Sequence, residues 1–261
     1  MKIGLSDQLI AAPLTKAFEA MQGFSFTMQS PRQNSLDLAE GKLDAAFITP
    51  LDFARSSSNL SLHPRTALIS HGATMTSQLM FRENMQTIET IAVFDDDSPY
   101  RMLAAILLNE VYDIECEFVE VDSSSEISDL LKSHSACFVE GDRALALSAT
   151  DLAQMDIGEE WSDKTEAAFI HLVLAVRDDS AEKQHLPEFK ASKLAQYIRP
   201  AADAYAKENP PIQATVLETL LEYSYASEAD DFSWDSLRVF FEYLYYYGAI
   251  EHIPGISFID S

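Results

Sequence analysis

Short apolar segments recur along most of the chain, and each ends in a small or polar cluster at which a helix can begin. Clear examples lie at residues 3–6, 45–49, 91–94 and 136–140. Alternation of short buried strands with helical segments is typical of a parallel α/β sheet. Such sheets bind ligands beyond the carboxyl ends of their strands. The pattern therefore predicts the place of a ligand site before it predicts the chemistry of that site.

The first block of this pattern contains two predicted helices. Pro13 suits the first turn of a helix over residues 14–21, and Asn34 or Ser35 can cap a second helix over residues 36–40. Together with the strands on either side, these helices form βαβ units.

A small, hydroxyl-rich turn follows, between predicted strands at residues 66–69 and 78–81. It contains His71, Thr76 and Ser77. Small and polar residues suit the close approach of a ligand, but they are also the usual residues of turns. Two alternatives are therefore open: these three residues bind a ligand, or they belong to a hairpin turn.

A second block repeats the pattern of the first. A helix is predicted over residues 100–112 and a strand over residues 115–121. A further helix over residues 127–132 follows Ser123 and Glu126, which have the spacing of a capping box.

The apolar run at residues 168–176 is expected to be a strand that returns to the first block, and helical periodicity begins after it. The predicted helices cover roughly residues 188–207, 211–226 and 233–247, without strand alternation. We therefore predict an α/β fold of two lobes with a ligand cleft between them, whose helical C-terminal tail packs on the first lobe. Lobe 1 comprises residues 1–88 and 178–261, and lobe 2 comprises residues 89–177.

The charge of the chain limits its partners. It has 42 Asp and Glu residues against 18 Lys and Arg residues, a net charge of −24, and 47% of its 261 residues are hydrophobic. A field of this sign repels nucleic acid and anionic membranes, so neither is an expected partner. It also opposes an anionic metabolite, which would need a locally positive pocket. The hydrophobic content is sufficient for a full globular core.

The N-terminus and the cysteines indicate a cytoplasmic protein. Met1-Lys2 runs directly into an apolar strand, without the pattern of a secretory signal. The apolar run at residues 167–176 is too short to span a bilayer. Cys116 and Cys137 lie outside any zinc-binding spacing, so two buried free thiols in a reducing compartment are expected.

The segment Ser98-Pro99-Tyr100-Arg101 is the best candidate for binding a small anion. It follows a predicted strand and begins a helix, whose N-terminal N–H groups favour negative charge, and Arg101 adds a positive charge. The three aspartates at residues 95–97 oppose an anion. The alternative is a capped helix that follows a solvated acidic turn.

Other clusters have structural alternatives as well. Asp142 and Arg143 follow a strand, where they either face a ligand or pair with each other. His171 lies in an apolar strand and is expected to be a satisfied core histidine. The run Tyr243–Tyr247 suits a core or a subunit interface, so a homodimer is an open alternative.

Several common catalytic motifs are absent from the sequence. It contains no phosphate-binding loop, no dinucleotide glycine fingerprint, no nucleophile elbow and no His-Glu-x-x-His. Nucleotide, flavin, zinc and serine-hydrolase chemistries are therefore less expected.

An ordered set of short motifs resembles one family. The set comprises Ile3-Gly4 with Ala12-Pro13-Leu14, residues 38–45, Ser98 before an apolar helix, Gly141-Asp142-Arg-Ala-Leu145, and residues 156–161 before an apolar strand. Together these motifs resemble the chorismate dehydratase and dihydroxynaphthoate synthase family of the futalosine route to menaquinone. The resemblance implies a periplasmic-binding-protein-like type II fold, two lobes joined by two crossing strands, and no metal or cofactor.

Within that family, the run from Gly141 to Leu145 resembles the dehydratase branch. The synthase branch has a histidine where this chain has Val139. The dehydratase branch in turn has an asparagine, implicated in the chemistry, where this chain has Ile10, and a Ser-Ser pair where it has Thr49-Pro50. Isoleucine cannot donate a hydrogen bond to a substrate.

Two functional hypotheses follow from the resemblance. The first is a dehydratase that removes water from chorismate to give an enolpyruvyl benzoate, with Ser98 and Arg101 holding a carboxylate. The second, which Ile10 and Tyr100 favour, is a diverged protein that binds a small carboxylate without turnover. No catalytic residue is assigned. The candidate substrate-binding residues are Ile10, Thr49, His71, Thr76, Ser77, Ser98, Tyr100, Arg101 and Asp142.

Overall fold

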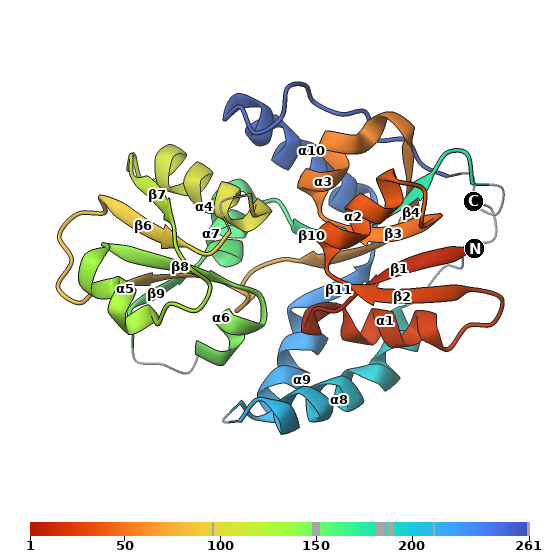
Figure 1. The fold of residues 1–261 in the computed structure, drawn as a ribbon, viewed down its shortest axis with the longest axis horizontal. Helices are drawn as coiled ribbons and strands as arrows, with labels where there is room; N and C mark the ends of the chain where they lie inside the picture. Colours follow the sequence, from red (N-terminus) through yellow and green to blue (C-terminus); the bar gives the residue numbers. More distant parts are fainter. Residues whose placement is uncertain (96, 148–151, 181–185, 187–190, 211, 260–261) are drawn as a thin grey trace. The chain divides into compact units, whose positions relative to one another are not determined.

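The computed structural model of the chain describes residues 1–95, 97–147, 152–180, 186, 191–210 and 212–259, with the side chain of residue 191 left out. The chain divides into two compact units, each with its own sheet (Figure 1). Unit 1 comprises residues 1–70 and 167–261, and unit 2 comprises residues 71–166. The chain therefore passes between the units twice, as the resemblance implied.

Unit 1 is built on a six-stranded sheet in which β10 lies between β3 and β4. β1 is parallel to β2 and β3, whereas β10 is antiparallel to both of its neighbours. Because β10 comes from the returning chain, this sheet is complete only after the whole of unit 2 has been passed. In sheet order the strands are β11 (Tyr225–Glu228), β4 (Leu60–Ser70), β10 (Phe169–Arg177), β3 (Ala45–Ile48), β1 (Lys2–Ser6) and β2 (Ser25–Gln29).

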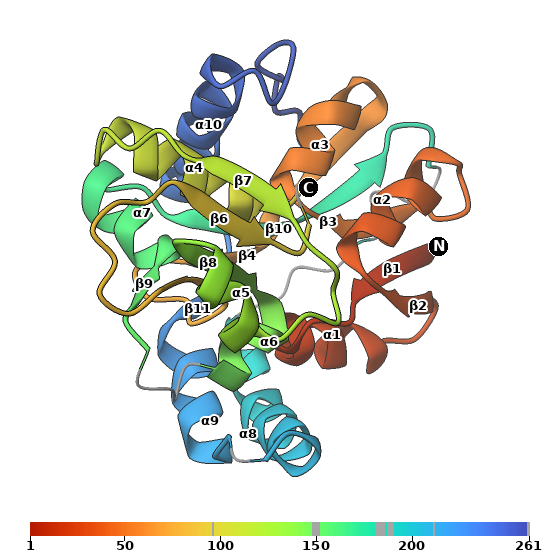
Figure 2. The same cartoon turned by 60° about the vertical axis from the view of Figure 1, so that its left-hand side comes forward.

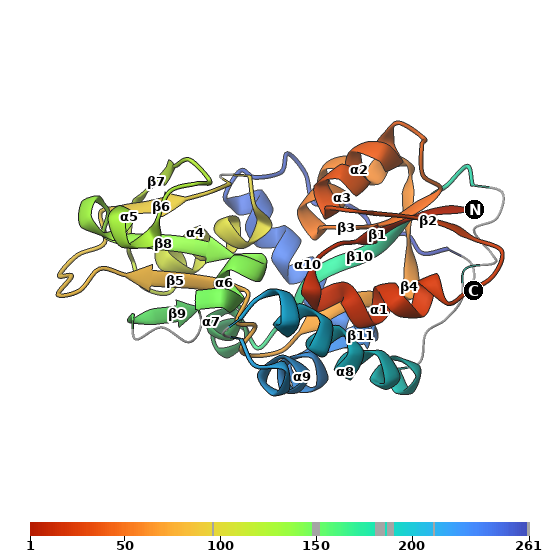
Figure 3. The same ribbon diagram turned by 60° about the horizontal axis from the view of Figure 1, so that its bottom comes forward.

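Helices cover both faces of this sheet. α2 (Pro31–Ala39) and α3 (Pro50–Ser56) lie on one face, and α1 (Ala12–Glu19) and α8 (Ala191–Glu208) lie on the other (Figure 3). α9 (Ala214–Tyr223) forms a helical pair with α8 (Figure 2). The last helix, α10 (Asp231–Tyr246), packs on α3, where the rings of Phe53 and Phe241 stack 6.2 Å apart.

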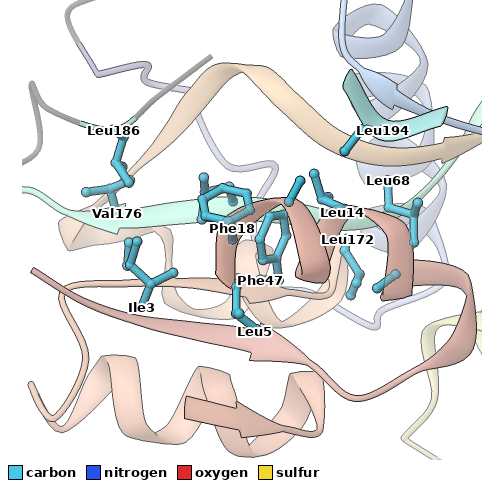
Figure 4. Close-up of a cluster of buried hydrophobic side chains, with 14 of the residues drawn as sticks. Ile3, Leu5, Leu14, Phe18, Phe47, Leu68, Leu172, Val176, Leu186 and Leu194 are labelled. Carbon is cyan, nitrogen blue, oxygen red and sulfur yellow. The ribbon is translucent and has the colours of Figure 1, made fainter. Parts of the chain in front are cut away.

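One hydrophobic core cluster of unit 1 lies between the sheet and α1 (Figure 4). Phe18 of α1 and Phe47 of β3 make an edge-to-face contact at 5.4 Å and are at most 1% exposed. Burial of each such side chain stabilises the fold by roughly 1.5–3 kcal/mol. Alternate residues of the strands, such as Ile3 and Leu5 of β1, face this helix, which is why the apolar segments are visible in the sequence.

Unit 2 repeats this arrangement with five strands. The order is β7 (Glu117–Glu120), β6 (Thr90–Val93), β8 (Ala136–Glu140), β5 (Ser77–Phe81) and β9 (Gln154–Asp156), from top to bottom in Figure 3. β6 is parallel to β7 and β8, and β5 is antiparallel to β8 and β9. The helices of this unit are α4 (Pro99–Glu110), α5 (Ile127–Ser133), α6 (Gly141–Leu147) and α7 (Ile157–Thr165).

The caps of two helices, α2 and α5, differ from the sequence-based prediction. α2 begins at Pro31 with Ser30 as its cap, because Asn34 is buried and its amide donates to the carbonyls of Leu5 and Phe47. Asn34 therefore joins α2 to β1 and β3 instead of capping a helix.

The capping box predicted before α5 is also absent. The residue that precedes α5 is Glu126, and its side chain makes no capping hydrogen bond. The carbonyl oxygens of Ser123 and Ser125 instead accept hydrogen bonds from the guanidinium of Arg143 at 3.0 and 2.6 Å. A tertiary contact thus replaces the local one.

Three strands, β2, β9 and β11, were not predicted, and the unit boundaries differ from the expected ones. β2 and β11 are short edge strands without a clear alternation, and β11 interrupts the helical tail where a helix to residue 226 was expected. The first residues of the helix predicted at 188–207 lie outside the described residues. β4 and β5 belong to different sheets, so residues 71–76 connect the units and do not form a hairpin turn. Residues 71–88 accordingly belong to unit 2. Residues 167–177 belong to unit 1, because β10 lies in its sheet.

Candidate functional site

The carboxyl ends of β6 and β8 bring two polar side chains together in unit 2. These strands are parallel neighbours, so their carboxyl ends lie at the same edge of the sheet. Ser98 lies just beyond β6 and caps α4, since its Oγ accepts hydrogen bonds from the backbone N–H groups of Tyr100 (3.2 Å) and Arg101 (3.4 Å). Glu140 is the last residue of β8.

Ser98 and Glu140 are directly hydrogen-bonded. The Ser98 hydroxyl donates to Oε2 of Glu140 in a short hydrogen bond. On the other side of β8, Ser77 is the register partner of Glu140, and the N–H of Gly141 donates to the carbonyl of Thr76 at 2.8 Å. Of the predicted residues, Ser98 therefore contacts a carboxyl group that the prediction did not include, while Thr76 and Ser77 adjoin the backbone of that residue and its neighbour.

The surroundings of Glu140 favour its neutral form. Burial raises the pKa of this carboxyl to about 7, and the nearby charge of Asp95 acts in the same direction, while the hydrogen bond from Ser98 opposes the shift. Both protonation states are therefore populated at neutral pH. The only signal for this residue in the sequence was an acidic side chain at the end of an apolar strand, directly before a glycine.

Arg101 and Arg143 follow β6 and β8, and the guanidinium groups of both lie over aromatic rings. The guanidinium of Arg101 lies over the ring of Phe118 on β7 at 4.3 Å, and that of Arg143 lies over Phe94 at 4.0 Å. Such cation–π contacts fix both guanidinium groups in place. The predicted capping of α4 is present, and Ser98 itself occupies the two N–H groups that a small anion would need.

The remaining predicted residues of unit 2 differ in exposure. Tyr100, Thr76 and Ser77 are buried, with at most 7% of each exposed, whereas His71 is exposed. Asp142 lies in the first turn of α6 and is partly exposed. The structure thus brings Ser98 to the side chain of Glu140, and Thr76 and Ser77 to the backbone of residues 140–141.

A second polar cluster in unit 2 holds the segment that follows His71. Asp156 caps α7, and its carboxylate accepts hydrogen bonds from the backbone N–H of Thr74 and from the side chain of Gln78. Its donors are the backbone N–H groups of Thr74, Met75, Gly158 and Glu159 and the side chains of Thr74 and Gln78. Every lone pair of this carboxylate is used within the unit, so we assign it a structural role.

Gly158 is required beside this cluster. A Cβ atom at position 158 would lie 2.2 Å from Cγ2 of Thr74, a distance that real contacts do not allow. The Asp156-Ile-Gly motif, which supported the family resemblance, thus packs α7 against residues 74–78.

In unit 1, the candidates Thr49 and Ile10 have structural surroundings. The Thr49 hydroxyl accepts a hydrogen bond from the N–H of Asp52 at 3.1 Å and donates to the Asp52 carboxylate at 2.7 Å, so it caps α3. Ile10 is 4% exposed and belongs to the core beneath α1. It also lines an apolar pocket of about 300 Å³ beside Leu194 of α8 and Leu221 of α9.

Replacement of Ile10 by asparagine is expected to destabilise the protein rather than create a substrate contact. A buried amide replaces an apolar side chain, and the free energy of unfolding should fall by about 3 kcal/mol. Urea denaturation measures this change, and Ile10→Val, expected to cost about 1 kcal/mol, is the matched control. An Ile10→Asn protein as stable as the wild type, with altered ligand affinity, would place this side chain in the ligand site.

The expectation for His171 is confirmed. This residue of β10 is 1% exposed, its Nε2 lies 2.7 Å from Oγ of Ser70, and its ring makes an edge-to-face contact with Phe169. Burial lowers the pKa of the imidazole to about 3, so the ring is neutral at physiological pH. The two cysteines are both free, although only Cys137 is fully buried.

Charge is distributed unequally between the units. Unit 2 has 21 Asp and Glu residues against 5 Lys and Arg residues, whereas unit 1 has 21 against 13. Among the described residues, no group of three or more His, Cys, Asp or Glu residues is arranged to hold a metal ion. No helix within the described ranges is both long and apolar enough to cross a membrane.

Comparisons with known proteins agree with this architecture. A family model described as menaquinone biosynthesis matches residues 1–246. The protein AF1704 from Archaeoglobus fulgidus is 14% identical, with a TM-score of 0.67 over 95% of this chain and 98% of that one. An ABC transporter structure from Parabacteroides distasonis is 12% identical, with a TM-score of 0.71 over 100% and 98%. The periplasmic aliphatic sulphonate binding protein SsuA from Escherichia coli is 12% identical, with a TM-score of 0.64 over 97% and 94%. The predicted periplasmic-binding-protein-like fold is thus confirmed.

Proposed function

Because the chain belongs to the menaquinone biosynthesis family, we propose that it eliminates water from chorismate to give an enolpyruvyl benzoate. The reaction breaks a C–H bond on the ring carbon that bears the ether and the C–O bond of the neighbouring hydroxyl. The ring becomes aromatic, which favours the products. The protein has to move one proton and help a hydroxyl leave.

One observation supports catalysis rather than binding alone. Glu140 lies at the carboxyl end of a parallel strand, where this kind of sheet binds ligands. The pKa of its carboxyl is raised to about 7, so it can accept or donate a proton at neutral pH. A carboxyl group that only fills space in a binding site has no need of a raised pKa, which costs stability.

A small carboxylate ligand also agrees with the fold. A structure of similar fold is named as an aliphatic sulphonate binding protein, so a small anion binds to at least one protein of this architecture. Chorismate has two carboxylates, and the excess of negative charge in unit 2 opposes it. We expect its affinity to increase with moderate salt, because added ions screen this repulsion.

The alternative is a protein that binds a small carboxylate without turnover. Its support is in unit 1, where Ile10 belongs to the core and the Thr49 hydroxyl is used in capping. Neither side chain offers a free polar group to a substrate. This alternative predicts binding of chorismate, or of a substituted benzoate, with no loss of water.

Incubation of the purified protein with chorismate distinguishes the two functions. Mass spectrometry should detect a product lighter than chorismate by one water, in proportion to enzyme and above a protein-free control. Calorimetric titration with chorismate then reports binding. Binding without a product at enzyme concentrations near those of the substrate would favour the second function.

A further inference from the structure

The carboxyl group of Glu140 is held in one position. It accepts a hydrogen bond from the Ser98 hydroxyl, while the Oγ of Ser98 accepts the N–H groups of Tyr100 and Arg101. With its lone pairs engaged by α4, the Ser98 hydroxyl has its hydrogen directed to Glu140. Ser98 is therefore a positioning residue for this carboxyl.

The backbone around Glu140 is held as firmly. Glu140 is paired with Ser77 across the β5–β8 ladder, and the N–H of the next residue, Gly141, donates to the carbonyl of Thr76 at 2.8 Å. The Ser77 hydroxyl lies 3.0 Å from that of Thr74 and is thus engaged within β5 and its preceding segment. Ser98 donates its hydrogen bond to Oε2 of Glu140, and Oε1 is the other oxygen of the same carboxyl group.

The charges near Glu140 are negative. Asp95, just beyond β6, acts on it electrostatically, and Asp142 follows it in α6. The two guanidinium groups of neighbouring elements stack on aromatic rings, Arg101 on Phe118 of β7 and Arg143 on Phe94. Burial and the Asp95 carboxylate together raise the pKa of Glu140 to about 7, whereas an ion pair with an arginine would lower it.

The stereochemistry of chorismate allows one group to serve as both base and acid. Its ether and hydroxyl substituents are trans, so the hydrogen on the ether carbon and the hydroxyl on the next carbon lie on the same face of the ring. One carboxyl group next to that face can reach both. Such a group must be able to hold and release a proton near the working pH.

We propose that Glu140 is the catalytic residue that transfers the proton during water elimination, with Ser98 positioning it; this inference rests on the proposed function. The Glu140 carboxylate takes the proton from the ether carbon, and the C–H electron pair forms the new ring double bond. The C–O pair leaves with the hydroxyl oxygen, which receives the same proton from Glu140. Water and the aromatic product form, and Glu140 returns to its carboxylate without any oxidant or reductant.

The test compares Glu140→Gln with Glu120→Gln. Both residues end a parallel strand of the same sheet, but Glu120 is exposed at the edge strand β7. We expect Glu140→Gln to lower kcat by about 10²- to 10⁴-fold, while the Kd for chorismate changes less than fivefold. Glu120→Gln should stay within twofold of the wild type. The melting temperature of Glu140→Gln at pH 8 should be no lower than that of the wild type, because a buried charge is removed.

The pH profile gives a readout that a merely structural role would not change. For the wild type, kcat/KM should rise through an ionisation near pH 7 as Glu140 loses its proton. Ser98→Ala removes the hydrogen bond to the carboxylate, so that ionisation should move to higher pH.

The outcomes separate the two proposals. Turnover by Glu140→Gln within threefold of the wild type, or a wild-type profile without an ionisation between pH 6 and 8, would overturn the role of Glu140 and leave the dehydratase function standing. Wild-type protein that binds chorismate without releasing water would overturn both.

Discussion

Replacement of Asp156 by alanine is expected to lower the free energy of unfolding of unit 2 by about 4 kcal/mol. The Asp156 carboxylate accepts four backbone N–H groups, two from the segment that enters unit 2 and two from the first turn of α7. Alanine leaves these buried donors without an acceptor. The loss of the helix cap alone accounts for about 1 kcal/mol.

The backbone held by Asp156 is strained, which adds to the effect. Met75 has φ +56°, a left-handed conformation that a non-glycine residue rarely adopts, and its N–H donates to Asp156 at 2.6 Å. Without this acceptor, residues 74–76 are free to relax, and the packing of Gly158 against Thr74 is lost with them. The N-terminal end of β5 should therefore become less ordered.

Urea denaturation followed by fluorescence measures the effect within unit 2. Trp161 in α7 is fully buried in this unit, and replacement of the other tryptophan, Trp234 in unit 1, by phenylalanine leaves Trp161 as the single probe. Asp163→Ala on the exposed side of the same helix is the matched control and should change stability by less than about 0.5 kcal/mol. Equal effects of the two substitutions would show that the Asp156 cluster does not stabilise the unit.

The second large effect is acid destabilisation through His171. Burial lowers the pKa of this imidazole to about 3 in the folded protein, whereas an unfolded histidine has a pKa near 6.5. The unfolded state therefore binds the proton more tightly between these two values. The contribution of His171 to stability is fully present above pH 6.5 and is lost at roughly 1.4 kcal/mol per pH unit below it. About 2–3 kcal/mol should be lost by pH 4.5.

A comparison of wild type with His171→Gln isolates this contribution. Glutamine can keep a hydrogen bond to Ser70, which lies 2.7 Å from the imidazole, but it does not titrate. The stability difference between the two proteins, measured by urea denaturation from pH 8 to pH 4.5, should move steadily in favour of the variant as pH falls. His252→Gln at an exposed position is the control. A difference independent of pH would show that His171 has the same pKa in the folded and the unfolded protein.

Asp156, His171 and Glu140 have different roles among the polar residues of the interior. Asp156 and His171 have hydrogen-bonding partners within their own unit and act on stability. Glu140 has one hydroxyl partner and a raised pKa, which is unfavourable for stability at neutral pH and useful for proton transfer. Because of this contrast, we assign a role in proton transfer to Glu140 at the end of β8 and a structural role to Asp156 at the end of β9.

The sequence by itself determined the local elements. The segments that became β1, β3, β6 and β8 were visible because buried strands need short apolar runs, and the start of α4 was visible because Ser98 caps it within three residues. These signals depend on neighbours along the chain. The family was also accessible, because its motifs are local and occur in a fixed order.

Only the tertiary structure decided which distant residues meet. Ser98 and Glu140 are 42 positions apart, and Thr74 and Asp156 are 82 apart, so their contacts depend on strand order rather than on local pattern. The same holds for Asn34, whose amide joins two strands, and for β11, which is a strand because β4 offers it an edge. Hydrogen bonds across a sheet join segments that are far apart in the sequence, so a local sequence pattern does not predict them. For this reason the Glu140 carboxyl group at the centre of the candidate site was identified only from the fold.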